Sequence, residues 1–130
     1  MLEHEELTKR IIGCCYLVLN ELGPGFLESV YHKALLVALR EAGLRAEQQV
    51  PLHVFFHGEC VGDFYADIVV EGIVIIELKA IASLLPEHKA QLINYLNATG
   101  MPVGLLVNFG GADLEVRRLT PTKKHDERKG

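Results

Sequence analysis

The chain has 130 residues, of which 49% are hydrophobic, and 13 Lys and Arg residues stand against 17 Asp and Glu residues for a formal net charge of −4. This length and apolar content predict one domain over residues 1–120, followed by a charged and disordered tail over residues 121–130. The acidic balance argues against a broad basic surface for nucleic acid, and no apolar run is long enough to span a bilayer.

The cysteines Cys14, Cys15 and Cys60 are odd in number, and two of them are adjacent. This pattern favours a reducing compartment over a disulfide framework, so we expect a cytoplasmic protein with no membrane association. The acidic N-terminal segment does not have the pattern of a signal peptide. No Cys or His spacing matches a structural zinc site, and His53 and His57 lie four residues apart on an expected strand, too far apart to share an ion easily.

Two helices are expected first. The first is expected over residues 5–22, with an apolar stripe at helical spacing from Leu7 to Leu22, and Gly23 and Gly25 end that pattern. A second helix is expected over residues 27–42, and its apolar stripe also carries Glu28. On spacing alone, a carboxylate that enters the protein to meet an ion and a first-turn Glu that favours the helix dipole are equally good interpretations.

Three strands are expected next, over residues 46–56, residues 60–70 and residues 73–80, because these runs are rich in Val, Ile and Phe and are separated by glycine-containing turns. The second and third of these strands form an antiparallel hairpin, and they carry charged residues in an otherwise apolar setting.

The register of this hairpin decides whether its charged residues can meet. A two-residue turn would place Asp67 on the face opposite to Glu77 and Lys79, and no site could form. A three-residue loop over residues 70–72, with its glycine in the left-handed conformation, would place Asp67 opposite Ile75 and on the same face as the other two. We predict the three-residue loop.

A third helix is expected from Pro86 to about residue 98. Its buried stripe is expected to contain Leu85, Leu92 and Leu96, with Gln91 and Tyr95 one turn apart beside it. A short apolar run over residues 103–109 is typical of a buried strand, and residues 114–119 alternate as an edge strand does.

The motif formed by Asp67, nine intervening residues and Glu77-Leu78-Lys79 resembles the core motif of the PD-(D/E)XK nuclease superfamily. Ala66 stands where the superfamily motif has its proline, a position that varies. The segment Gly25-Phe-Leu-Glu28-Ser-Val-Tyr31 matches the signature of the GxxExxY family within that superfamily. The segment Gln91-Leu-Ile-Asn-Tyr95 is similar to a Gln-x-x-x-Tyr motif of its exonuclease-like branch.

The resemblance implies an α/β fold of the PD-(D/E)XK, or restriction-endonuclease-like, type, in which a mixed central sheet is flanked by helices. It also implies that Asp67, Glu77 and the backbone carbonyl of Leu78 bind Mg²⁺ or Mn²⁺, that Glu28 helps to hold the metal or a metal-bound water, and that Lys79 positions or activates the attacking water.

By the same resemblance, Tyr31 would support the orientation of Glu28, while Gln91 and Tyr95 would organise the site and approach the substrate phosphate. The expected function is metal-dependent hydrolysis of phosphodiesters, with DNA as the expected substrate, and a homodimer could reach both strands of a duplex. Two alternatives stay open. One is a catalytically silent module that binds nucleic acid or protein, and the other is a structural protein with a buried ion pair between Glu77 and Lys79.

Overall fold

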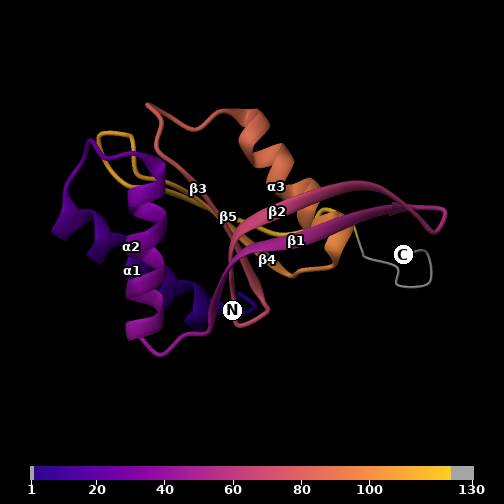
Figure 1. Cartoon of the computed structure of the whole chain (residues 1–130), viewed down its shortest axis with the longest axis horizontal. Coiled ribbons are helices and arrows are strands. Elements are labelled where there is room, and N and C mark those ends of the chain that lie inside the picture. The colour runs from indigo at the N-terminus through magenta and orange to yellow at the C-terminus, as the bar shows by residue number, and fades with distance from the viewer. Residues whose placement is uncertain (1, 124–130) are drawn as a thin grey trace.

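A computed structural model of the chain describes residues 2–123, and it has the predicted order of two helices, three strands, one helix and two strands (Figure 1). The elements are α1 (Glu5–Leu22), α2 (Glu28–Glu41), β1 (Ala46–Phe56), β2 (Glu59–Val70), β3 (Val74–Lys79), α3 (Pro86–Thr99), β4 (Val103–Asn108) and β5 (Glu115–Leu119). The strands form one sheet in the order β1-β2-β3-β4-β5. The pair β3 and β4 is parallel and is connected through α3, whereas the other neighbouring pairs are antiparallel.

The helices cover both faces of this mixed sheet. Helices α1 and α2 pack on one face, where Ile11, Cys15 and Leu35 join a core cluster with Ile76 of β3. Helix α3 packs on the other face, in a second cluster built by Leu92, Leu96, Ile75 and Leu106. Because side chains alternate along a strand, the odd-numbered residues of β3 point to the α3 side. The predicted α/β architecture is confirmed, and this alternation decides where the charged residues of β3 lie.

The loop between β2 and β3 has three residues, as predicted, but the prediction placed it one position too early. Val70 pairs with Val74, so the loop is formed by residues 71–73 rather than by residues 70–72. Both Glu71 (φ 54°) and Gly72 (φ 65°) adopt the left-handed conformation. Glu71 is held there by Arg45, whose backbone N–H donates to the Glu71 side chain and whose carbonyl accepts the Glu71 backbone N–H at 2.8 Å. These contacts come from a distant segment, so local turn chemistry did not reveal them.

The ribbon formed by β1 and β2 changes sides as it passes the centre of the sheet. Near one end Ala46 packs in the cluster under α1 and α2, whereas Leu52, on the same strand and of the same parity, packs in the cluster under α3. The change occurs at Gln49, which has a left-handed backbone (φ 50°) and interrupts the recorded pairing between the two strands opposite Asp67. Irregularities of this kind increase local twist and re-aim side chains.

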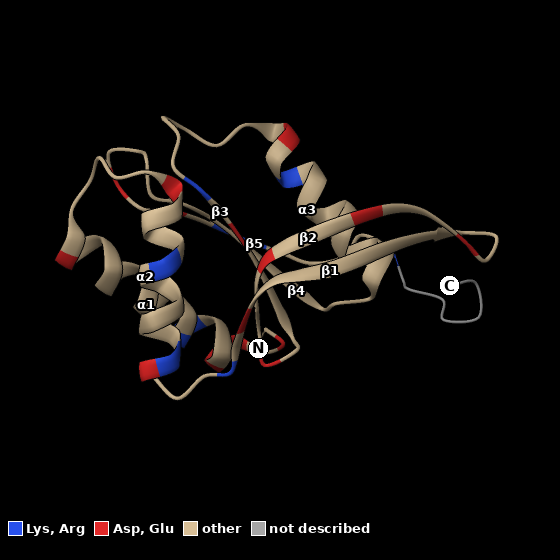
Figure 2. Ribbon diagram, in the orientation of Figure 1, with Lys and Arg blue, Asp and Glu red and all other residues tan. Residues whose placement is uncertain are grey.

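Beyond this twist the β1–β2 hairpin projects from the body of the molecule (Figure 1). Its residues 46–70 contain no Lys or Arg, and Figure 2 shows acidic but no basic segments along it. Pro51 lies in β1, which is an edge strand, and edge strands tolerate a residue without a backbone N–H.

The loop after β3 is tied to the sheet by Asn108, a fully buried polar residue at the end of β4. Its side-chain amide donates to the Ile81 carbonyl at 2.9 Å and to Glu115 Oε1 at 2.8 Å, and its Oδ1 accepts the backbone N–H groups of Ile81 and Gly110, each at 3.0 Å. Since a buried amide without partners is costly, this network fixes the chain as it leaves β3.

Two expectations about buried residues need correction. Leu85 was expected in the buried stripe of the third helix, but it is the residue before α3 and 46% of its surface is exposed. Leu22 was expected in the stripe of the first helix and is 38% exposed at its end. Both residues lie at a helix end, Leu22 as the last residue of α1 and Leu85 as the residue before α3.

Part of the segment expected as a disordered tail lies against α3. The backbone N–H groups of Thr122 and Lys123 donate to Asn97 Oδ1 at 3.0 and 2.9 Å. Residues 124–130 of the expected tail lie outside the described residues. Among the described residues, no helix is both long and apolar enough to cross a membrane.

Substitution of Gly110 by alanine should destabilise the fold. A Cβ at this position would lie 2.3 Å from the Ile81 backbone nitrogen and 2.4 Å from the Ala80 carbonyl carbon, and backbone atoms cannot move aside cheaply. We expect a loss of about 2 kcal/mol or more in the free energy of unfolding.

Urea denaturation measures this loss, and Gly13→Ala is the matched control. A Cβ at Gly13, inside α1, meets no atom within 4 Å. That variant should gain roughly 0.5–1 kcal/mol through helix propensity. Equal stabilities for the two variants would contradict the close approach at Gly110.

Candidate functional site

The site begins where the ladder between β2 and β3 stops. The last recorded pair is Ile68 with Ile76, and one further step in this register brings Asp67 opposite Glu77. Beyond that point a side chain takes the role of a backbone carbonyl: Asp67 Oδ2 accepts the hydrogen bond from the backbone N–H of Leu78 at 2.8 Å. The register prediction had placed Asp67 opposite Ile75, two positions away. The prediction that Asp67 and Glu77 share a face is confirmed, because a shift of two residues preserves the side.

Glu77 carries the strongest electrostatic perturbation described for a carboxyl group of this chain. Its Oε1 is buried and has no hydrogen-bond partner among the described residues. Burial, followed by the nearby Asp67 carboxylate, raises the pKa of Glu77 to about 8, although the Lys79 ammonium acts in the opposite direction. Two carboxyl groups face each other here in a partly desolvated place, so that a proton or a cation is needed between them.

The donors around Glu77 suit a hard divalent ion. The N–H and C=O of one strand residue point to the same side, and Leu78 directs its N–H to Asp67, so its carbonyl also points toward β2. The next carbonyl, that of Lys79, turns the other way and accepts the Phe109 N–H at 2.9 Å. Two carboxylates and one carbonyl therefore converge at the end of the ladder, and oxygen donors of this kind fit Mg²⁺ or Mn²⁺. The donor set fits the group that the resemblance implies.

Lys79 and Glu28 complete the charged side of the site. Lys79 is half-buried at the end of β3, on the same face as Glu77. Glu28 is the first residue of α2 and is exposed, so it is not buried in the apolar stripe that contains Tyr31. Partial burial and the Asp67 carboxylate nevertheless raise the pKa of Glu28, whereas Lys79 and His32 lower it. Glu28 thus lies within electrostatic reach of the Asp67 and Lys79 side chains.

Tyr31 is connected to the loop before Glu28 and not to Glu28 itself. Its ring is 1% exposed and stacks on Phe109, with centroids 4.7 Å apart and planes at 5°. Its hydroxyl donates to the Gly23 carbonyl at 2.7 Å and accepts the Phe26 N–H at 3.2 Å. The loop also needs Gly25, whose φ is 97°. Tyr31 therefore fixes the backbone that leads into α2 and hence the start of that helix.

Of the two residues expected from α3, Tyr95 lies near the carboxylates of Asp67 and Glu77. Tyr95 is half-buried, and its ring lies 4.8 Å from that of Phe64. Burial and the charges of Glu77 and Asp67 raise the pKa of Tyr95, which places its hydroxyl in the field of the site. Gln91, one turn earlier, is exposed.

A model of the PD-(D/E)XK nuclease superfamily matches residues 5–119, which is almost all of the described chain. The chain belongs to this superfamily. That membership suggests nuclease activity, and it fits the mixed five-stranded sheet with its three helices.

A solved structure titled "Crystal structure of SSO0001" is similar in fold to this chain, with 22% sequence identity and a TM-score of 0.57. The alignment covers 78% of this chain and 52% of the other, so this chain spans about half the length of that solved structure. No curated protein matches the chain.

Sequence reasoning missed two residues that shape the site. Gln49 gives the β1–β2 ribbon its change of side opposite Asp67, and its left-handed backbone has no sequence signal beyond the neighbouring Pro51. Asn108 anchors the loop that follows Lys79. A polar residue near the end of the apolar run 103–109 was the available signal for Asn108.

Glu77 should make the stability of the metal-free protein fall as pH rises. A carboxyl group whose pKa is raised from 4.5 to about 8 contributes stability that is fully present below pH 4.5 and is lost as pH rises through 8. Glu77→Gln removes this ionisation, so at pH 9 in chelator it should exceed the wild type by roughly 2 kcal/mol or more.

Thermal melts in chelator across pH 4 to 9 would measure this difference, with Glu59→Gln, an exposed site on the hairpin, as the control. Identical pH profiles for wild type and Glu77→Gln would show that Glu77 is not perturbed as described.

Tyr31→Phe should keep the stack on Phe109 and lose both hydrogen bonds of the hydroxyl. We expect a loss of about 1 kcal/mol in unfolding free energy, together with faster hydrogen exchange of the Phe26 amide. Exchange monitored by NMR distinguishes this local effect from a general one. An unchanged Phe26 amide would mean that the hydroxyl does not hold the loop.

Proposed function

We propose that this chain is a metal-dependent nuclease that hydrolyses phosphodiester bonds in DNA, with Mg²⁺ or Mn²⁺ held by Asp67, Glu77 and the Leu78 carbonyl. The observation that carries the proposal is the buried, unpartnered Oε1 of Glu77 beside a second carboxylate. A group in that state needs a proton or a cation, and strained groups of this kind cluster at functional sites.

The protein residues would divide the work of binding this ion. The Leu78 N–H fixes one oxygen of Asp67 and leaves the other for a ligand. Glu77 would contribute Oε1 from the opposite strand, and Glu28 would contribute a third carboxylate from the start of α2. The ion, when bound, neutralises this negative charge, polarises the phosphoryl group and lowers the pKa of water. The acidic groups also repel phosphate when no cation is present, so substrate binding should require metal.

Lys79 is the residue to which we assign the attacking water. Its ammonium group lies on the same face as Glu77 and is placed to hold the water and stabilise the charge that develops on the phosphate. We assign Tyr95 and Gln91 to the substrate side, since Tyr95 lies in the field of the carboxylates and Gln91 is exposed one turn away on α3.

The proposal extends to the family within the superfamily. The segment from Gly25 to Tyr31 carries the GxxExxY pattern, and its three defining residues have separate tasks in this fold. Gly25 adopts a positive φ, Glu28 faces the charged side chains and Tyr31 holds the loop between them. On this basis we assign the chain to the GxxExxY family.

A second candidate is a module that binds nucleic acid or protein without cleaving it. The formal charge of −4 and a projecting hairpin that has no Lys or Arg favour it, because autonomous DNA binding usually needs a basic surface. The two candidates differ in whether the site turns over substrate.

The decisive experiment is cleavage of labelled single-stranded, duplex and branched DNA and RNA, with Mg²⁺, with Mn²⁺ and with chelator. The proposal predicts metal-dependent cleavage of DNA that falls at least roughly 100-fold in Lys79→Ala, because the charge that acts on the water and phosphate is lost. Lys33→Ala is the matched control, since Lys33 is exposed on α2. It should cleave as the wild type does.

The rise in melting temperature with metal distinguishes a variant that binds metal without cleaving substrate from one that has lost the metal site. Lys79→Ala should still gain melting temperature with Mn²⁺, whereas Asp67→Asn should not. A folded wild type that binds metal but cuts no substrate in the panel would favour the binding module. A wild type indifferent to metal would contradict both the ion site and the nuclease.

A further inference from the structure

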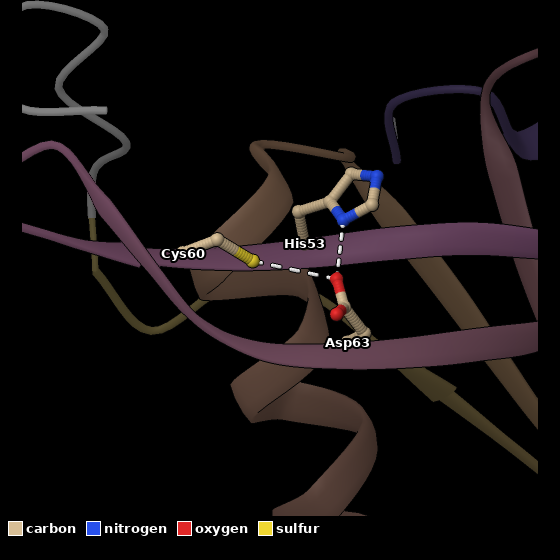
Figure 3. A group of neighbouring side chains, drawn as sticks. All are labelled: His53, Cys60 and Asp63. Carbon is tan, nitrogen blue, oxygen red and sulfur yellow. Dashed lines mark hydrogen bonds and ion pairs between the residues drawn. The ribbon is translucent and has the colours of Figure 1, made fainter.

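Three side chains that can bind a metal meet on the projecting β1–β2 hairpin (Figure 3). His53 Nδ1 lies 2.6 Å from Asp63 Oδ1, and Cys60 Sγ lies 3.3 Å from the same oxygen. One ligand atom from each residue falls within 4.8 Å of the other two, and all three residues are exposed. A passing ion can therefore reach them.

A β-bulge creates this cluster. His53 pairs with Asp63 and Val54 pairs with Gly62, but the next pair is Phe55 with Cys60, so Val61 is an extra residue in β2. In an unbroken ladder Cys60 would project from the face opposite to Asp63, since their positions differ by an odd number. The bulge turns the Cys60 side chain to the face of His53 and Asp63. Sequence spacing alone could not show this arrangement, and it led us to expect no zinc site.

The three donors select a borderline metal. Thiolate and imidazole prefer Zn²⁺ to the hard ions expected at Glu77, and carboxylate oxygen is an accepted third ligand. Donors in a tetrahedral zinc site lie roughly 3.3–3.7 Å from one another. The spacing of Cys60 Sγ and Asp63 Oδ1 already falls in this range, and His53 and Asp63 need to separate by about 1 Å, which exposed side chains can do by rotation.

The surroundings of the cluster also suit a cation. Residues 46–70 carry no Lys or Arg that would compete or repel. The hairpin extends beyond the helices (Figure 1). Its side chains Phe56, Val61 and Tyr65 are each more than 60% exposed, so little core packing holds the two strands together at this end. A metal ion held by both strands would add a constraint to the backbone ladder at this end.

We propose that His53, Cys60 and Asp63 bind a Zn²⁺ ion that links the two strands of the hairpin. The thiol proton of Cys60 passes to solvent on binding, two ligands come from β2 and one from β1, and water fills the fourth position. The site is independent of the nuclease proposal, because it shares no residue with Asp67, Glu77 or Lys79.

The test uses the full-length chain carrying Glu77→Gln, which disables the other ion site. Titration with Co²⁺, as a coloured substitute for Zn²⁺, should give the near-ultraviolet absorption of a cobalt–thiolate bond, and Zn²⁺ should displace it. Cys60→Ser should abolish the absorption, and Asp63→Asn should weaken binding at least tenfold. Glu59→Gln, an exposed acid on the same hairpin, should bind as its parent does.

Backbone hydrogen exchange provides a readout that does not depend on colour. Zn²⁺ should slow exchange of amides within residues 53–63 in the parent and leave them unchanged in Cys60→Ser. Absence of a thiolate band in the folded protein would overturn the proposal. So would a band that persists in Cys60→Ser, since the thiolate would then belong to Cys14 or Cys15.

Discussion

The geometry of the candidate site depends on one hydrogen bond, which the backbone N–H of Leu78 donates to the Asp67 carboxylate. It takes the place of the next rung of the ladder between β2 and β3, so the backbone pairing of the two strands ends there. This opening in the ladder leaves the Glu77 carboxyl facing Asp67, and the Leu78 carbonyl points toward the same place. In a regular ladder the Leu78 N–H and carbonyl would both pair with the backbone of β2. They are available to the candidate site because the pairing of β2 and β3 ends before Leu78.

The rest of the fold holds this opening in place. Gln49 turns the β1–β2 ribbon opposite Asp67, Asn108 anchors the chain after Lys79, and Tyr31 fixes the loop that begins α2. The Asn108 hydrogen bonds with Ile81 join segments that are distant in the sequence, whereas those of Tyr31 act within residues 23–31. The two carboxyl groups can therefore be kept close despite their repulsion, at a cost to the metal-free fold that a bound cation would remove.

Much of the architecture was predictable from local pattern, since helical periodicity and strand runs recur with clear breaks. The shared face of Asp67 and Glu77 was predictable too, because it needs only the parity of the loop length. That Asp67 and Glu77 lie directly opposite each other was not predictable, because this register depends on Arg45, from another part of the chain, holding Glu71 in the loop. The bulge that brings His53, Cys60 and Asp63 together could not be predicted for a related reason, since sequence spacing does not reveal an extra residue in one strand of a pair.

The most direct test of the central claim is where Mn²⁺ binds, mapped by paramagnetic broadening of amide resonances in the Lys79→Ala protein, which cannot turn over substrate if the account is right. The account predicts that substoichiometric Mn²⁺ broadens the amides of Asp67, Glu77 and Leu78 first, and that Glu77→Gln removes this effect. Broadening confined to exposed acidic residues elsewhere, with residues 67 and 77–79 still sharp, would contradict it.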